Sequence, residues 1–236
     1  MLEDLRWLGF HWDEGPDIGG PLGPYNQSER RSFYRSALEK LHAANLIFPC
    51  TRSRRDVLDA ARAPHEASRE LDEPIYPPQF RPPSDTPLPP LGDVINVNWR
   101  LRVPDSETLT FDDGYFGPQQ AIVGRDFGDF LVWRKDDTPS YQLACVVDDA
   151  AMQITEVVRS RPDSFDLPPN PAVSSSCYTA PAFYHCPLMV DDKGVRLAKR
   201  HDALSLRAMR ESGKPPGEIL RNFNLELRKA GTENPK

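Results

Sequence analysis

Residues 141–159 read YQLACVVDDAAMQITEVVR, an apolar stretch that two adjacent carboxylates interrupt. The first half carries apolar side chains at alternate positions, a pattern typical of a buried β-strand: Leu143, Cys145 and Val147. We expect Asp148 and Asp149 to end this strand. The apolar residues of 154–158 then predict a second short strand, which ends at Arg159.

Upstream, residues 27–45 read QSERRSFYRSALEKLHAAN and predict an amphipathic helix. Ser28 is placed to cap its first turn. Its apolar side chains are expected to share one face: Phe33, Ala37, Leu38, Leu41 and Ala44.

Between these segments, residues 94–103 (VINVNWRLRV) alternate apolar and polar side chains and predict a half-buried strand. Residues 129–133 (DFLVW) predict a second strand. Because helical and extended segments alternate, the predicted fold class is α/β. The 25 prolines gather mainly in two blocks, 74–90 and 162–181, which exclude continuous helix or central strand and divide the chain into three parts.

Downstream, GVRLAKRHDALSL at residues 194–206 is a basic turn before a predicted helix. We expect that helix over 203–212, capped by Asp202 and ended by Gly213, and a further helix from Pro215 to about Lys229. Residues 193–229 hold ten Lys or Arg against four Asp or Glu. This region is either an anion-facing surface or an ordinary solvated helical face.

The composition narrows the class of protein. A chain of 236 residues, 39% of them hydrophobic, can bury a core. We predict a cytoplasmic location, because no run approaches the roughly 18 apolar residues of a membrane helix and the acidic first residues do not resemble a signal peptide. The net charge of −6 argues against a protein that coats nucleic acid. The cysteines form no CxxC pair, so we expect reduced thiols at Cys50, Cys145, Cys177 and Cys186.

Six segments in order carry a family resemblance: DLRWLGFHWDEGP, YNQSER, YQLACVVDDA, ITEVVR, APAFYHCPL and RLAKRHDALSL. Together they resemble the catalytic core of bacterial glutamyl-tRNA synthetases, which are class I aminoacyl-tRNA synthetases. The resemblance is strongest to the short paralogue, the glutamyl-Q tRNA(Asp) synthetases. It implies an N-terminally truncated Rossmann-like core, whose remaining part covers 1–47, and a Pro-rich insert over 48–93 that matches a degenerate zinc-site region. It further implies an acceptor-type insert with the glutamate-site strands over 94–192, and a KMSKS-type loop with C-terminal helices over 193–236.

The resemblance also implies roles for individual residues. Arg196, Leu197, Ala198, Lys199 and Arg200 match the KMSKS-type loop that meets ATP. Lys199 matches the lysine that stabilises the pyrophosphate leaving group, and is the candidate catalytic residue. Tyr141 and Arg159 match the positions that hold glutamate, because a guanidinium can pair with a carboxylate through two hydrogen bonds. For Asp148 and Asp149, structural capping is at least as reasonable as direct chemistry.

The sequence departs from the family pattern at the positions of the family's zinc ligands. The family pattern has Cys-x-Cys before Thr-Arg, then a tyrosine and a further cysteine. Here the matching positions are Phe48, Cys50, Tyr76 and Phe80, so only Cys50 and Tyr76 remain as candidate ligands. We predict no zinc and expect apolar packing in its place.

The sequence departs from the family pattern in two further places. No HIGH-like tetrapeptide occurs in the sequence, and we expect the chain to begin downstream of the family's HIGH segment. Between Arg159 and Ala182, proline-rich sequence replaces the leucine-rich pattern of the family at a similar length. We interpret residues 160–181 as a compensated frame shift, as a hypothesis.

The implied function is ATP-dependent activation of glutamate and its transfer to the queuosine base of tRNA(Asp). The alternatives are a catalytically impaired remnant that is non-enzymatic or binds tRNA, and a fragment of a glutamyl-tRNA synthetase. The expected partners are glutamate, ATP with Mg²⁺, and the anticodon stem-loop of tRNA(Asp). We expect a monomer that binds neither membranes nor DNA.

Overall fold

The computed structural model describes residues 1–61, 75–92, 95–105, 107–160, 180–186 and 205–221. The chain divides into two compact units. One comprises residues 22–185, and the other residues 1–21 together with 186–236. Within the described residues, no helix is long and apolar enough to cross a membrane.

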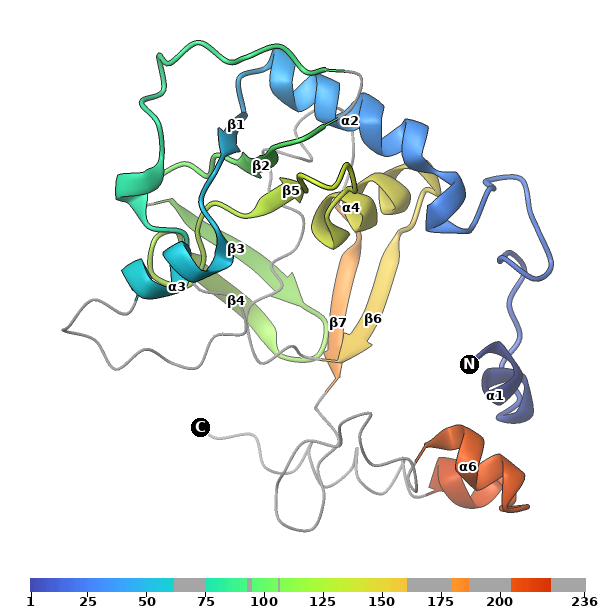
Figure 1. Cartoon of the computed structure of the whole chain (residues 1–236). Coiled ribbons are helices and arrows are strands. Elements are labelled where there is room, and N and C mark those ends of the chain that lie inside the picture. The colour runs from blue at the N-terminus through green and yellow to red at the C-terminus, as the bar shows by residue number, and fades with distance from the viewer. Residues whose placement is uncertain (62–74, 93–94, 106, 161–179, 187–204, 222–236) are drawn as a thin grey trace, which may run out of the picture. The chain divides into compact units, whose positions relative to one another are not determined.

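The larger unit combines helices with two sheets (Figure 1), which confirms the α/β prediction. Its helices are α2 (Arg31–Ala43), α3 (Arg54–Ala61) and α4 (Tyr141–Ala151). One sheet has the order β1-β2-β5, from β1 (Ile47–Cys50), β2 (Asn98–Leu101) and β5 (Leu131–Trp133). The other has the order β4-β3-β7-β6, from β3 (Thr108–Asp113), β4 (Gly117–Ile122), β6 (Glu156–Ser160) and β7 (Ala182–Cys186).

The predicted helix over 27–45 is confirmed as α2, but its start and its buried face differ from the prediction. Ser28 lies in a preceding 3-10 turn, Gln27–Glu29, and the residue at the N-cap is Arg30. The buried side chains are Tyr34, Leu38 and Leu41, whereas Phe33 is exposed. The helix therefore turns its tyrosine, rather than the adjacent phenylalanine, toward the core.

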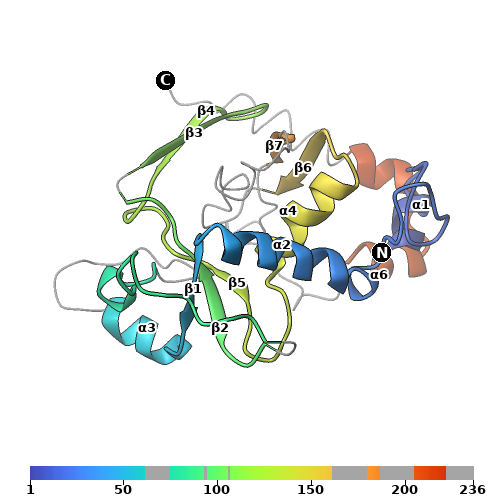
Figure 2. The same cartoon turned by 90° about the horizontal axis from the view of Figure 1, so that it is seen from above.

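Both strands predicted between the proline blocks are present and pair with each other. β2 runs antiparallel to β1, with Pro49 opposite Trp99, and antiparallel to β5, with Trp99 opposite Trp133. Leu101 and Val132 are fully buried in the same core cluster. That cluster also takes side chains from α2 and α4, and the view from above (Figure 2) shows these helices beside each other.

The strand predicted over residues 143–147 is wrong: this segment is the first half of helix α4. The Ser140 hydroxyl accepts a hydrogen bond from the Leu143 N–H at 3.2 Å and so caps the helix. Leu143 and Ala144 enter the core cluster and Val147 packs against it, which is the spacing of one helical face. Asp148 and Asp149 continue the helix rather than ending a strand. A short apolar run suits either structure, and here the serine cap and the helical face decide.

The second predicted strand of that stretch is confirmed as β6. It belongs to the sheet in which β7 lies between β3 and β6. β3 forms a hairpin with β4 and meets β7 in parallel, with Asp113 opposite Phe183. The sheet therefore brings the end of β3 beside β7, which in turn is the neighbour of β6.

The smaller unit contains α1 (Leu2–Trp7) and α6 (Leu206–Glu211). Arg210 joins them, with its Nε 2.9 Å from the Asp4 Oδ1 atom. Ser205 caps α6 by accepting from the Ala208 N–H at 3.1 Å, so the described helix begins later than predicted. Gly213 follows the helix with φ +76°, as its predicted role requires. Residues 216–221 are helical, and the predicted cap Asp202 lies outside the described residues.

Candidate substrate-binding site

One face of α4 carries polar groups at every fourth position: Tyr141, Cys145 and Asp149. Tyr141 opens the helix, and its side chain is 68% exposed. Burial raises the pKa of the Cys145 thiol, and a side-chain hydrogen bond from Tyr141 opposes that rise. Burial, followed by the neighbouring Asp148 charge, raises the pKa of Asp149. This face thus presents an exposed phenol together with a half-buried thiol and a half-buried carboxyl group.

The same helix is fixed to the start of α2 through Asp148, seven residues after Tyr141. The Arg30 Nε atom donates to Asp148 Oδ1 at 2.6 Å, and the Gln27 amide donates to Oδ2 at 2.9 Å. The Tyr34 hydroxyl lies 3.0 Å from both carboxylate oxygens. Burial and this carboxylate raise the pKa of Tyr34, so the phenol stays protonated. Asp148 therefore has a structural role, and it orients the face that holds Tyr141.

Arg159 on β6 lies within electrostatic range of the α4 face. Its positive charge opposes the rise in pKa of both Cys145 and Asp149. The Arg159 Nε atom donates to His185 Nε2 on β7 at 2.8 Å, and the guanidinium carbon lies 5.2 Å from the Phe183 ring centroid. Tyr141 and Arg159, both predicted to hold glutamate, thus border the same partly buried region.

His185 is in turn hydrogen-bonded to Asp113 at the end of β3. The His185 Nδ1 atom is 2.5 Å from Asp113 Oδ2, and both side chains are buried. Burial alone would raise the pKa of Asp113, but hydrogen bonds from the Phe116 N–H and from His185 outweigh it, so the pKa lies below its ordinary value. Asp113 therefore stays ionised next to His185.

Comparison with known proteins assigns the chain to a family. Residues 1–233 match the family described as tRNA synthetases class I (E and Q), catalytic domain. The chain belongs to this family. It is 40% identical over 236 residues to the glutamyl-Q tRNA(Asp) synthetase of Nitratidesulfovibrio vulgaris and 42% identical over 223 residues to that of Symbiobacterium thermophilum. Each match covers 93% of this chain and 67% of the relative.

Solved structures give the same assignment of fold. The chain is similar to a glutamate tRNA ligase from Elizabethkingia meningosepticum, crystallised in complex with its amino acid, with a TM-score of 0.60 and 25% identity. The match covers 86% of this chain and 42% of that ligase, so the chain spans less than half of it. Its α/β core is that of a class I synthetase catalytic domain.

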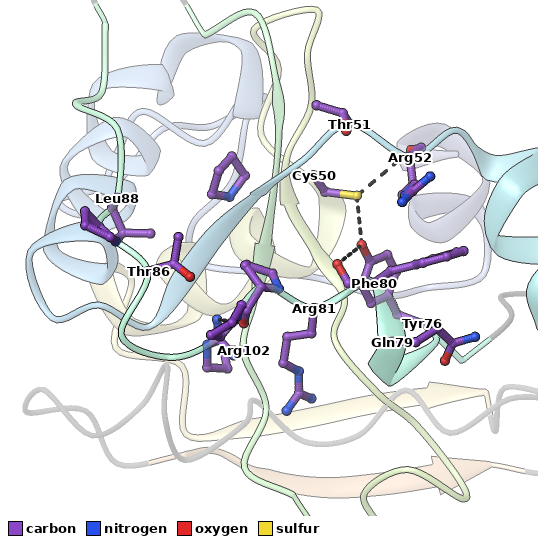
Figure 3. A pocket seen from close by; sticks show the side chains of 14 residues that line it. Cys50, Thr51, Arg52, Tyr76, Gln79, Phe80, Arg81, Thr86, Leu88 and Arg102 are labelled. Atoms are coloured by element: carbon purple, nitrogen blue, oxygen red, sulfur yellow. Dashed lines mark hydrogen bonds between the residues drawn. The ribbon is translucent and has the colours of Figure 1, made fainter.

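The positions that match the family's zinc ligands come together in this chain, but as an aromatic cluster. The ring centroids of Phe48 and Tyr76 are 5.9 Å apart, and those of Tyr76 and Phe80 are 6.1 Å apart. Cys50 Sγ lies 3.3 Å from the Tyr76 hydroxyl (Figure 3). Since neither phenylalanine has a donor atom, the residues present do not fit zinc. Among the described residues, no group of three or more His, Cys, Asp or Glu could hold a metal ion.

A cavity of about 340 Å³ opens beside this cluster (Figure 3). Three arginines from different segments line it: Arg52, Arg81 and Arg102. Arg81 is held by Asp129, with Nε 2.7 Å from Oδ2. The Arg52 guanidinium carbon lies 4.5 Å from the Phe80 ring centroid. Burial, together with the Arg81 charge, lowers the pKa of Arg102.

Some predicted site residues fall outside the described part of the chain, and other residues of the site were not predicted. Lys199 and the loop from Arg196 to Arg200 lie outside the described residues. The sequence did not single out His185 or Asp113, although the APAFYHCPL motif contains the histidine. Their connection depends on the strand order β3-β7-β6, which periodicity does not reveal.

Proposed function

We propose that this synthetase activates glutamate with ATP and transfers it to the queuosine base of tRNA(Asp). The observation that carries the proposal is that the Arg159 charge acts on Cys145 and Asp149, on the α4 face that begins with Tyr141. The glutamyl-Q tRNA(Asp) synthetases among the relatives support this choice of reaction.

Arg159 supplies the charge that glutamate recognition needs. A guanidinium binds a carboxylate through two parallel hydrogen bonds, which separates glutamate from glutamine and from apolar amino acids. Tyr141 adds a hydroxyl at an exposed helix start, within reach of a ligand that enters from solvent. The ionised Asp113 is hydrogen-bonded to His185, which contacts Arg159, so its negative charge limits the net positive charge of the site.

The activation step is an in-line attack by the glutamate carboxylate on the α-phosphate of ATP. It forms the bond from carboxylate oxygen to phosphorus and breaks the bond to pyrophosphate, which leaves with its charge. We assign Lys199, in the loop from Arg196 to Arg200, to stabilise that charge. Mg²⁺ would accompany the triphosphate and neutralise part of its charge.

The basic region 193–229 is the proposed contact for the tRNA backbone, through phosphate neutralisation by its lysines and arginines.

The activation step is tested by glutamate-dependent exchange of labelled pyrophosphate into ATP. We expect exchange by the full chain and its loss in the Lys199→Ala and Arg159→Ala variants. A Lys214→Ala variant, which changes a lysine outside the loop, is the matched control and should retain exchange. A folded, monodisperse chain that binds glutamate without exchange would overturn activation and leave a non-catalytic binding protein.

The transfer step is tested with labelled glutamate and three RNAs. We expect label on tRNA(Asp) that carries queuosine, and none on the same tRNA with guanosine at that position or on tRNA(Glu). Label on tRNA(Glu) alone would instead identify glutamyl-tRNA synthetase activity.

A further inference from the structure

Three adjacent strands carry a continuous hydrogen-bonded path that ends at the proposed glutamate ligand. Asp113 is the last residue of β3, His185 lies on β7, and Arg159 lies on β6. Because β7 is between the other two strands, the path crosses the sheet from one neighbour to the next. Asp113 and His185 are buried, at 3% and 5% exposure, so water does not replace these contacts.

The partners on both sides fix the protonation pattern of His185. The Nε atom of an arginine can only donate, so the His185 Nε2 atom, 2.8 Å away, accepts. The proton of the neutral ring then resides on Nδ1, which donates to the Asp113 carboxylate at 2.5 Å. Asp113 also accepts from the backbone N–H groups of Tyr115 and Phe116, at 3.0 and 2.9 Å. These two backbone hydrogen bonds hold the Asp113 carboxylate in place in addition to its contact with His185.

His185 and Phe183 hold the Arg159 guanidinium from two directions. They occupy the same side of β7, two positions apart, and their rings stack with an interplanar angle of 12°. Phe183 faces the guanidinium carbon at 5.2 Å, while His185 takes the Nε hydrogen. Because Nε is engaged, a carboxylate is received by the terminal nitrogens rather than by the Nε side of the guanidinium. This orientation allows both oxygens to bind at the end of the arginine.

We propose that His185 is a positioning residue for glutamate, which Asp113 holds in its Nδ1–H form so that it aims the Arg159 guanidinium at the substrate carboxylate. This inference rests on the proposed binding of glutamate by Arg159. The arginine side chain has many rotamers, and its pre-alignment lowers the entropic cost of binding. His185 itself does not touch the substrate.

Two substitutions at His185 separate the two hydrogen bonds. In His185→Asn the amide nitrogen replaces Nδ1 and can still donate to Asp113, but the shorter side chain has no acceptor at the Nε2 position for the Arg159 Nε–H. In His185→Gln the longer amide can present an acceptor near the Nε2 position. We expect the dissociation constant for glutamate, measured by calorimetry, to rise about tenfold in the asparagine variant and by less than about threefold in the glutamine variant. ATP affinity should be unchanged in both.

Nitrogen NMR provides a readout that needs no activity. In the wild-type chain we expect the His185 signals of the Nδ1–H tautomer and a slowly exchanging Arg159 Nε–H. The slow exchange of the Arg159 Nε–H should be lost in His185→Asn and retained in His185→Gln. The Nε2–H tautomer in the wild type, or unchanged glutamate affinity in a folded His185→Asn variant, would overturn the inference. Wild-type protein with the expected tautomer but no affinity for glutamate would overturn the proposed function, and the role of His185 with it.

Discussion

Arg30 and Asp148 form a buried ion pair across 118 residues of sequence, with the Arg30 Nε atom 2.6 Å from Asp148 Oδ1. Arg30 is the N-cap residue of α2 and is 1% exposed, and Asp148 lies in the last turns of α4. The pair therefore connects the starting end of one helix to the closing end of another. It also sets the rotation of α4, and with it the direction in which Tyr141 and Cys145 face.

Removing this pair should cost much of the stability of the larger unit. We expect Asp148→Ala to lower the free energy of unfolding by about 3–5 kcal/mol, because Arg30 is left buried without its carboxylate. Urea unfolding followed by circular dichroism measures the loss. Asp149→Ala, one position along the same helix, is the matched control and should cost far less. A loss below about 1 kcal/mol in Asp148→Ala would show that the pair does not hold the helices together.

Asp149 should make stability depend on pH in the opposite sense to most carboxylates. Its folded-state pKa lies above the ordinary value of 3.8, because burial and then the Asp148 charge disfavour ionisation. Its ionised form therefore destabilises the fold above the folded pKa, and this penalty disappears as pH falls below 3.8. We expect Asp149→Asn to raise the urea midpoint at neutral pH, with a gain that shrinks toward acid. A neutral-pH midpoint below that of the wild type would contradict this assignment.

Substitutions at the proposed glutamate ligands should act on glutamate rather than on ATP. Arg159→Lys keeps the charge but loses the paired geometry, so we expect the KM for glutamate to rise by about ten- to a hundredfold. Tyr141→Phe should raise it by about fivefold, the scale of one neutral hydrogen bond. Steady-state pyrophosphate exchange at varied glutamate and varied ATP separates the two substrates. Equal changes in both KM values would indicate a general disturbance of the core.

The aromatic cluster should be convertible into a metal site. Phe48→Cys combined with Phe80→Cys gives four donors together with Cys50 and Tyr76. We expect this double variant to bind about one zinc ion per chain and to melt at a lower temperature in the presence of a chelator. Elemental analysis after dialysis and thermal unfolding measure both effects. The wild-type chain should retain no zinc and should melt at the same temperature with and without chelator, and a chelator-sensitive wild type would contradict the assignment.

Where apolar runs are short, the sequence predicts the position of a regular segment more reliably than it predicts whether that segment is a helix or a strand. Alternation correctly located β2, which buries every second side chain, Trp99 and Leu101, in the core. β5 was also located, although it buries the adjacent Val132 and Trp133. It failed for residues 143–147, where five residues fit a strand and a helix equally well. There the signal was Ser140, a residue whose side chain caps a helix only if one follows.

The sequence predicted only those residues of the candidate site that lie in segments matching the family. Tyr141 and Arg159 follow from matched segments, and the structure brings both to one region. The partners of Arg159 could not be foreseen, because His185 and Asp113 meet through a parallel contact between strands 72 residues apart. A lone histidine in sequence gives no indication of which strand will lie beside it.

The pairing of Pro49 with Trp99 has a consequence for how the protein behaves in a crowded solution. The Arg102 N–H donates to the Leu46 carbonyl, so hydrogen-bonded pairs alternate from that point and Pro49 falls at a non-hydrogen-bonded pair. Its backbone nitrogen therefore points away from β2, toward the outer edge of the described sheet. A proline there offers no N–H to an incoming strand. β1 is thus a poor template for strand addition, and this edge resists the growth of intermolecular sheets that leads to aggregation.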